Sequence, residues 1–102
     1  MFSKNKRVVC ADGFSMSVQA HDGAYCYPRI DGAEKYSEVE VGFPSETEPL
    51  ILSFAEDPDR PTETVYGYVP VQTVALVLAK HGGIVEGDVP NGVAKLSAPQ
   101  GE

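Results

Sequence analysis

The stretch that decides the fold is residues 7–20, which read RVVCADGFSMSVQA. An apolar run at 7–11 is followed by Asp12-Gly13, and residues 14–20 then alternate between apolar and polar side chains. A period of two is typical of a half-buried strand. The Asp-Gly pair tolerates the left-handed backbone that a two-residue type I′ turn requires. We therefore predict an N-terminal β-hairpin with Asp12 and Gly13 as its turn.

Residues 36–43 alternate in the same way. The side chains expected to point into the core are Val39, Val41 and Phe43. Those expected on the opposite, solvated face are Tyr36, Glu38 and Glu40. The alternation predicts a strand in a sheet with one wet, acidic face.

Two further segments, 50–54 and 62–69, also favour strands. The first is expected to direct Leu50, Leu52 and Phe54 inward, and the second is rich in Thr, Val and Tyr. Acidic turns that contain proline precede each of them, so we predict a meander of three strands from 36 to 69. Residues 21–35 are predicted to form a structured loop with a short edge strand at 24–27.

Pro70 marks a change from strand to helix periodicity. Proline suits the first turn of a helix, and apolar side chains then recur at helical spacing at Val71, Val74, Ala75 and Leu78. Lys80 and His81 lie where the helix dipole favours positive charge, and Gly82 suits a left-handed cap. We predict a helix over 70–81 that lies deep on the sheet, and its valine content leaves a strand as the alternative.

These segments together predict an α+β fold, an antiparallel β-meander of about five strands with one C-terminal helix packed on one face. A chain of 102 residues is long enough for one core and too short for two. We expect a single domain over 1–86. Residues 87–102 contain turn residues and few large apolar side chains, so we expect a loosely held tail there.

Neither a signal peptide nor a membrane span is expected. The basic start, residues 1–7, is followed by an apolar run of only four residues, 8–11, whereas a secretory segment needs about 7–15 and a span about 20. Cys10 and Cys26 allow at most one disulfide, which is far below the density of secreted scaffolds. We predict buried, reduced thiols and a cytoplasmic protein.

The net charge of −7 is concentrated in one part of the chain. Residues 34–63 hold nine acidic and two basic residues, which alone gives −7. This acidity excludes a protein that binds phosphates by counterion release, and it favours a basic partner. Such a patch can imitate the charge of a nucleic-acid backbone. The alternative is that the acidic loops only keep the protein soluble.

We predict that this acidic surface, together with nearby tyrosines, is a protein-interaction site. Tyrosine is enriched at interfaces because it offers a large area with a polar tip. The predicted interaction residues are Glu38, Glu40, Glu46, Glu48, Glu56, Asp57, Asp59, Glu63, Tyr25, Tyr27 and Tyr36. Tyrosines that merely flank the core are the alternative.

The residues that could support catalysis or metal binding lack a recognisable spacing. The one sequence cluster of metal-ligating types is Cys10, Asp12, His21, Asp22 and Cys26. It contains no CxxC or HxxxH pair, and no local signature supports a cysteine–histidine nucleophile pair. The chain also lacks a GxxxxGK[ST] or GxGxxG loop for phosphates. We therefore predict no catalytic residues, no metal and no cofactor.

Three stretches give the chain a resemblance to small proteins encoded in the accessory regions of bacteriophages and prophages. They read CADGFSMSVQA (10–20), EVEVGFPS (38–45) and TVYGYVP (64–70). The resemblance implies a host-directed role in the bacterial cytoplasm. Proteins of this size and acidity often inhibit a defence complex stoichiometrically, and anti-CRISPR proteins are the best-known group.

Three hypotheses for function follow. The first is a non-catalytic phage-type inhibitor that binds a basic, nucleic-acid-handling surface of a bacterial defence complex, with no direct contact with nucleic acid or membrane. The second is a phage assembly or structural protein that self-associates through an exposed strand edge. The third is a small enzyme or metal protein that uses Cys10, His21 and Cys26.

Overall fold

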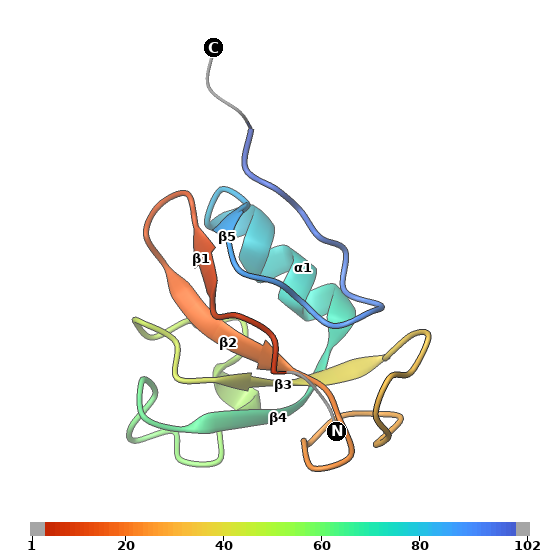
Figure 1. Ribbon diagram of the computed structural model, residues 1–102. Helices are drawn as coiled ribbons and strands as arrows, with labels where there is room; N and C mark the ends of the chain where they lie inside the picture. The colour runs from red at the N-terminus through yellow and green to blue at the C-terminus, as the bar shows by residue number, and fades with distance from the viewer. Residues whose placement is uncertain (1–3, 100–102) are drawn as a thin grey trace.

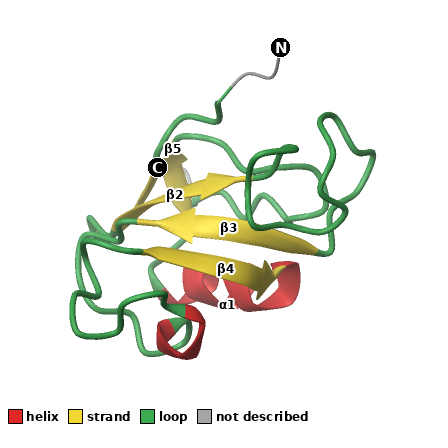
Figure 2. Ribbon diagram, turned by 90° about the horizontal axis from the view of Figure 1, so that it is seen from below, coloured by secondary structure: helices red, strands yellow, loops and turns green. Residues whose placement is uncertain are grey.

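The computed structural model describes residues 4–99, which form a five-stranded antiparallel sheet and one α-helix (Figure 1). The strands are β1 (Val8–Cys10), β2 (Ser15–Gln19), β3 (Glu38–Gly42), β4 (Val65–Pro70) and β5 (Ile84–Glu86). The sheet order is β4-β3-β2-β1-β5. The helix α1 (Val71–Lys80) follows β4 directly and packs against one face of the sheet (Figure 2). The predicted α+β class, with one helix near the C-terminus, is therefore confirmed.

The N-terminal hairpin forms, with Val8 paired to Met16. Its connection is a three-residue loop and not the predicted two-residue type I′ turn. The Gly13 N–H donates to the Cys10 carbonyl at 2.9 Å, and Gly13 alone in the loop has a positive φ, +94°. A type I′ turn needs positive φ at both central residues. The Asp12 carboxylate instead accepts a hydrogen bond from the Phe14 N–H at 2.9 Å, which holds the loop in its longer form.

The prediction of a strand at 50–54 is wrong. This segment contains a short 3-10 helix, η1 (Leu52–Phe54), and its fully buried side chain is that of Ile51. Leu50 is exposed, and its N–H donates to the Glu48 carboxylate at 2.9 Å, which turns the chain. The three-strand meander is therefore wrong as well, because β3 pairs directly with β4 and residues 43–64 form a long connection.

The predicted orientation of side chains along 36–43 is correct in the centre of the segment and wrong at both of its ends. Val39 and Val41 are buried, as predicted. Phe43 is exposed, because the chain leaves the ladder there with φ +51°. Tyr36 precedes the strand and is buried, with its hydroxyl donating to the Ile30 carbonyl at 2.7 Å. In the predicted edge strand at 24–27, Tyr27 forms one isolated bridge, with Glu38.

The helix predicted over 70–81 forms as α1 (Val71–Lys80), and Pro70 is its N-cap and the last residue of β4. Val74, Val77 and Leu78 are buried against the sheet, whereas Leu76 is exposed on the opposite side. The helix therefore lies on the sheet by one face and is not enclosed all round. Gly82 takes the predicted positive φ after the helix. Among residues 4–99, no helix has the length and apolar character needed to cross a membrane.

Residues 87–99 pack on the domain, which differs from the expected loose tail. Val93 and Ala98 are buried, and Ser97 forms a parallel bridge with Ile84 of β5. In Figure 1 the chain runs away from β5 and then returns alongside it. Gly92, with φ +104°, lies against the Tyr36 backbone, where a larger residue does not fit. This close approach replaces the large apolar side chains that the tail lacks. The last residues of the predicted tail, 100–102, lie outside the described part.

Replacing Gly92 with alanine tests this packing. The Cβ of an alanine would collide with the Tyr36 carbonyl and would lie 2.8 Å from its nitrogen. We expect Gly92→Ala to lower the free energy of unfolding by about 3 kcal/mol or more, the sum of overpacking and a positive-φ cost. Gly13→Ala is the matched control, because Gly13 has a similar φ with no atom within 4 Å, and should cost about 1–2 kcal/mol. Urea unfolding measures both, and equal losses would show that the tail is not packed as described.

Candidate functional site

The sheet face opposite α1, here called the outer face, carries the candidate site. Alternation along the strands places polar or small residues on it, whereas the other side of the sheet forms the core. Ser17 and Gln19 of β2 and Glu40 and Gly42 of β3 line a cavity of about 210 Å³ on this face, beside Phe43. The connection 20–37 also reaches this face, since the Tyr25 N–H donates to the Glu40 carboxylate at 2.9 Å.

A bulge in β4 directs Tyr68 onto the outer face. The register between β3 and β4 shifts between Val39 and Val41, so Glu40 lies opposite the extra residue. Tyr68 has φ +54° and is 44% exposed. Its N–H donates to the Tyr25 carbonyl at 3.0 Å. Bulges commonly redirect a side chain in this way.

Gly67 forms the floor beneath the two tyrosines. A Cβ on Gly67 would lie 3.2 Å from the Cβ of Tyr25, so glycine lets Tyr25 lie close over the strand. The rings of Tyr25 and Tyr68 have centroids 6.0 Å apart with an interplanar angle of 40°. This separation lies within the range of favourable aromatic pairs.

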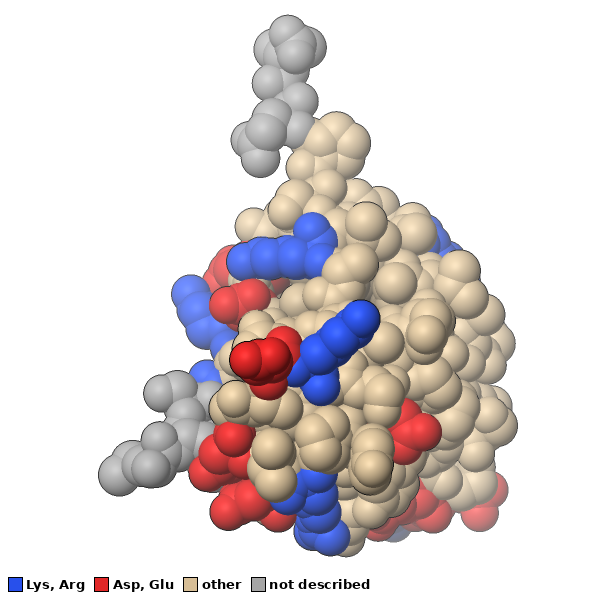
Figure 3. All heavy atoms as spheres, turned by 90° about the vertical axis from the view of Figure 1, so that its right-hand side faces the viewer, with Lys and Arg blue, Asp and Glu red and all other residues tan. Residues whose placement is uncertain are grey.

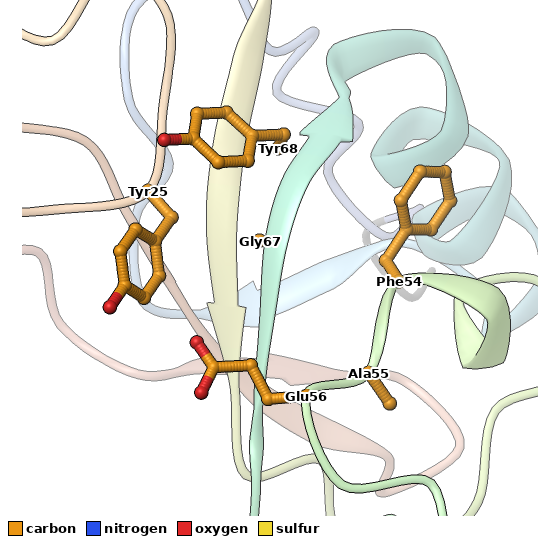
Figure 4. Close-up of a pocket in the computed structure, with 6 residues that line it drawn as sticks. All are labelled: Tyr25, Phe54, Ala55, Glu56, Gly67 and Tyr68. Atoms are coloured by element: carbon orange, nitrogen blue, oxygen red, sulfur yellow. The ribbon is translucent and has the colours of Figure 1, made fainter.

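A cavity of about 290 Å³ lies at this point, lined by Tyr25, Phe54, Ala55, Glu56, Gly67 and Tyr68. In Figure 4, Tyr25, Tyr68 and the Glu56 carboxylate lie on the same side of β4, whereas the Phe54 ring points to the side of the helix. The outer-face part of the cavity therefore has two aromatic walls and one negatively charged group.

Tyr68 and Phe43 share an unusual backbone. Within residues 4–99 they are the only residues other than glycine with a positive φ. Each such residue costs about 1–3 kcal/mol. Both are aromatic, and Phe43 is 49% exposed. The fold therefore bears a cost in stability to present two rings to solvent.

Seven of the eight acidic residues predicted for the site separate into three groups, and the eighth, Glu48, is buried. Glu38 and Glu40 are half-buried on β3. Glu46 is exposed in the 43–64 connection, and the remaining exposed acids lie where that connection approaches β4: Glu56, Asp57, Asp59 and Glu63. Only Glu40 and Glu56 border the cavities of the outer face.

Two of the residues predicted to form the interaction site are buried and do not reach the surface. Tyr36 is only 3% exposed and belongs to the core, and Glu48 is only 1% exposed. Tyr25 and Tyr27 are exposed, but Tyr27 contributes to a different cavity. Phe43, Gly67 and Tyr68 were not among the predicted site residues. The signal for Tyr68 was the glycine inside a strand pattern, which is typical of a bulge.

Glu48 is buried because it completes a cluster of charges. Its Oε2 accepts from Lys80 Nζ at 2.9 Å, and its Oε1 lies 2.6 Å from His81 Nε2. The other ring nitrogen of His81, Nδ1, lies 2.6 Å from Asp12 Oδ2. The His81 ring also stacks on Phe14, with centroids 4.0 Å apart. Both nitrogens are thus held by carboxylates, an arrangement that suits a structural imidazolium and not a catalytic base.

The cluster shifts the pKa values of His81, Glu48 and Asp12. Burial lowers the pKa of His81, but the hydrogen bonds to Glu48 and Asp12 raise it by more than burial lowers it. The pKa of His81 therefore lies above its usual value. Burial raises the pKa of Glu48, and the Leu50 N–H, His81 and Lys80 lower it by more. The Phe14 N–H and then His81 lower the pKa of Asp12. The four formal charges cancel when His81 is protonated.

The cysteines and the loop histidine give weak support for reaction chemistry. Burial raises the pKa of both Cys10 and Cys26, so both thiols are protonated near neutral pH. Of the predicted metal-ligating cluster, the structure brings together His21 and Asp22, joined by Asp31, with one ligand atom from each within 4.8 Å of the others. Within the loop, His21 Nδ1 accepts a hydrogen bond from the Gly23 N–H, and the Asp31 carboxylate accepts one from the Asp22 N–H.

The charges on the rest of the surface are more mixed. Figure 3 shows acidic and basic side chains interleaved over part of one flank, next to a broad area without charged side chains. Near the C-terminus, Glu86 lies 3.8 Å from Lys6 and Asp88 lies 3.2 Å from Lys95.

In the comparisons with known proteins, no family model matches the chain, and neither the curated proteins nor the solved structures give a match.

The charge cluster predicts how stability depends on pH. A raised pKa for His81 contributes stability below pH 6.5 that is lost as the pH rises through the folded-state value. The lowered pKa values of Glu48 and Asp12 contribute stability that is lost in acid, as each carboxylate becomes protonated. We expect the melting temperature to be highest between about pH 4.5 and 6.5. At higher pH it should fall by roughly 4–8 °C for each kcal/mol of unfolding free energy that is lost.

Calorimetry across pH 4–9 measures this dependence. Asp12→Asn should move the alkaline decline to lower pH, because it removes one of the two carboxylates that raise the pKa of His81. A melting temperature that rises between pH 6.5 and 8.5 would contradict the assignment.

The backbone of Tyr68 predicts a reversal of the usual order of substitutions. In a strand, alanine normally stabilises more than glycine. At φ +54° we expect Tyr68→Gly to be more stable than Tyr68→Ala by about 1 kcal/mol, since only glycine avoids the left-handed cost. Urea unfolding of both variants gives the difference, and the ordinary order would show that the bulge is not formed as described.

Proposed function

We propose that this chain is a non-catalytic binding protein of the phage anti-defence type. It captures a basic, nucleic-acid-handling surface of a bacterial defence complex through the outer face of its sheet. The observation that carries the proposal is the display of Tyr68 and Phe43, two exposed aromatic residues in a costly backbone conformation, beside Glu40 and Glu56.

Aromatic side chains support a binding role because they dominate the energetic centres of protein interfaces. Tyr25 and Tyr68 give the outer face such a centre, and Phe43 lies at the second cavity of the same face. A face that served only to complete the core would gain nothing from strained, half-exposed rings. The proposed interaction site is therefore an aromatic centre with an acidic border, whereas the sequence predicted an acidic surface accompanied by Tyr25, Tyr27 and Tyr36.

The acidic border supports a basic partner. Four acids and one base, Arg60, lie in residues 56–63, and Arg60 lies 3.8 Å from Glu63. Charges at the rim of an interface mainly raise the association rate and make it sensitive to salt. A host-directed, anti-CRISPR-like role comes from the resemblance to phage accessory proteins in three stretches, 10–20, 38–45 and 64–70, each of which contributes residues to the outer face.

Self-association through a strand edge has less support. The outer edge of β4 is bridged by Ala55 to Tyr66, and the outer edge of β5 is bridged by Ser97 to Ile84. Such cover is how proteins keep edge strands from pairing with other chains. The thiols have raised pKa values, which disfavours a cysteine nucleophile.

Two charge-reversal variants with the same net charge test the proposal. Asp59→Lys with Glu63→Lys changes the acidic border, and Glu34→Lys with Glu86→Lys changes exposed acids elsewhere. We expect the wild type and the second variant to retain the same basic protein from a bacterial lysate at low salt and to release it at high salt. The first variant should lose it, with an association rate about tenfold lower for the purified pair.

The inhibitory role is tested in bacteria with a single active defence system. In a strain with CRISPR interference, the wild type and the second variant should rescue transformation by a targeted plasmid, and the first variant should not. Equal behaviour of the two variants would contradict a localised acidic border. Failure of the wild type in every defence system tested would contradict the anti-defence role.

A further inference from the structure

We propose that the cavity between Tyr25, Tyr68 and Glu56 receives the guanidinium group of an arginine side chain. This inference rests on the proposed function, since it names the group of the partner that the outer face recognises. The outer-face part of the cavity has two aromatic walls, a glycine floor and a single carboxylate, and Phe54 and Ala55 line the rest. That set of groups suits a planar cation, which can stack on a tyrosine ring while it pairs with a carboxylate.

The size of the cavity limits what it can hold. Its volume is about 290 Å³, which is at the lower end of ligand pockets, about 300–1,000 Å³. It suits one side chain better than a nucleotide or another cofactor. Its polar group is an acid, Glu56, which excludes a phosphate or carboxylate ligand by charge.

The chain itself shows that Tyr25 can hold a guanidinium. The Cζ of Arg29 lies 5.4 Å from the centroid of the Tyr25 ring, which is within the range of a cation–π contact. Arg29 does not line the cavity, so it leaves the cavity wall formed by Tyr25 accessible. A second guanidinium can therefore lie on the cavity side of the tyrosine pair.

The backbone also prepares the site before a ligand arrives. The Tyr68 N–H bonds to the Tyr25 carbonyl at 3.0 Å, and the Tyr25 N–H bonds to Glu40 at 2.9 Å. These bonds fix the main chain under both rings, and Gly67 sets how closely Tyr25 approaches. A pre-arranged pair of rings binds with less loss of side-chain entropy than a mobile pair.

An NMR titration of the isotope-labelled protein with small probes tests the site in the absence of a partner protein. The probes are N-acetyl-arginine amide, its neutral analogue N-acetyl-citrulline amide, and N-acetyl-lysine amide. We expect arginine amide to give saturable shifts in the amide resonances of Glu56, Gly67 and Tyr68, with affinity on the order of millimolar. Citrulline amide should give none, and lysine amide should bind at least about threefold more weakly.

Matched variants locate the site. Tyr68→Ala should weaken arginine binding about tenfold, and Tyr68→Leu, which keeps an apolar side chain, should behave alike if the alanine variant does not fold. Tyr27→Ala is the control, because Tyr27 is an exposed tyrosine outside this cavity. Glu56→Gln should weaken binding about threefold or more, and Glu34→Gln should not.

The outcomes separate this inference from the proposed function. Absence of shifts at 100 mM probe, equal binding of citrulline or lysine amide, or equal loss in Tyr27→Ala each overturns the arginine site. If arginine binds here while the charge-reversal variants capture the same proteins equally, the site stands and the proposed function fails. If capture depends on the acidic border and arginine amide does not bind, the proposed function stands and the site fails.

Discussion

The buried carboxylate of Glu48 is the interaction on which the rest of the structure depends. It joins three parts of the chain, because it lies in the 43–64 connection, bonds Lys80 and His81 at the end of α1 and, through His81, reaches Asp12 in the hairpin loop. Breaking one buried ion pair costs about 3–5 kcal/mol, a large part of the 5–15 kcal/mol that stabilises a small domain. The helix, the hairpin and the connection are thus held in one arrangement by one buried carboxylate in an acidic segment.

With one face of the sheet committed to the helix, the opposite face is shaped by two connections. Residues 20–37 bring Tyr25 over β4, and residues 43–64 bring Glu56 beside it. The bulge in β4 supplies Tyr68. The candidate site is therefore assembled from segments that are far apart in sequence, and each is fixed by backbone hydrogen bonds to the sheet or to its neighbour.

The sequence predicted the parts of the fold that depend on local periodicity. The hairpin, the core positions Val39 and Val41, and the helix after Pro70 follow from spacing alone. It failed where a long-range partner decides the outcome. Leu50 and Leu52 have the pattern of a strand, but the neighbouring Glu48 must turn inward to meet His81, and the strand is lost. The acids near the site, Glu40 and Glu56, were identified, whereas Phe43 and Tyr68 were not. An aromatic residue does not by itself signal a positive φ, and the one local sign of the bulge was Gly67 beside Tyr68.

The place of β5 in the sheet has a consequence for synthesis of the protein. Although β1 is the first strand of the chain, it lies between β2 and β5, the last strand. The helix α1 joins β4 at one edge of the sheet to β5 at the other (Figure 1). A nascent chain on the ribosome therefore holds an incomplete sheet, with one side of β1 unpaired, until residues 84–86 have emerged. The sheet is therefore complete only after β5 has followed α1 out of the exit tunnel.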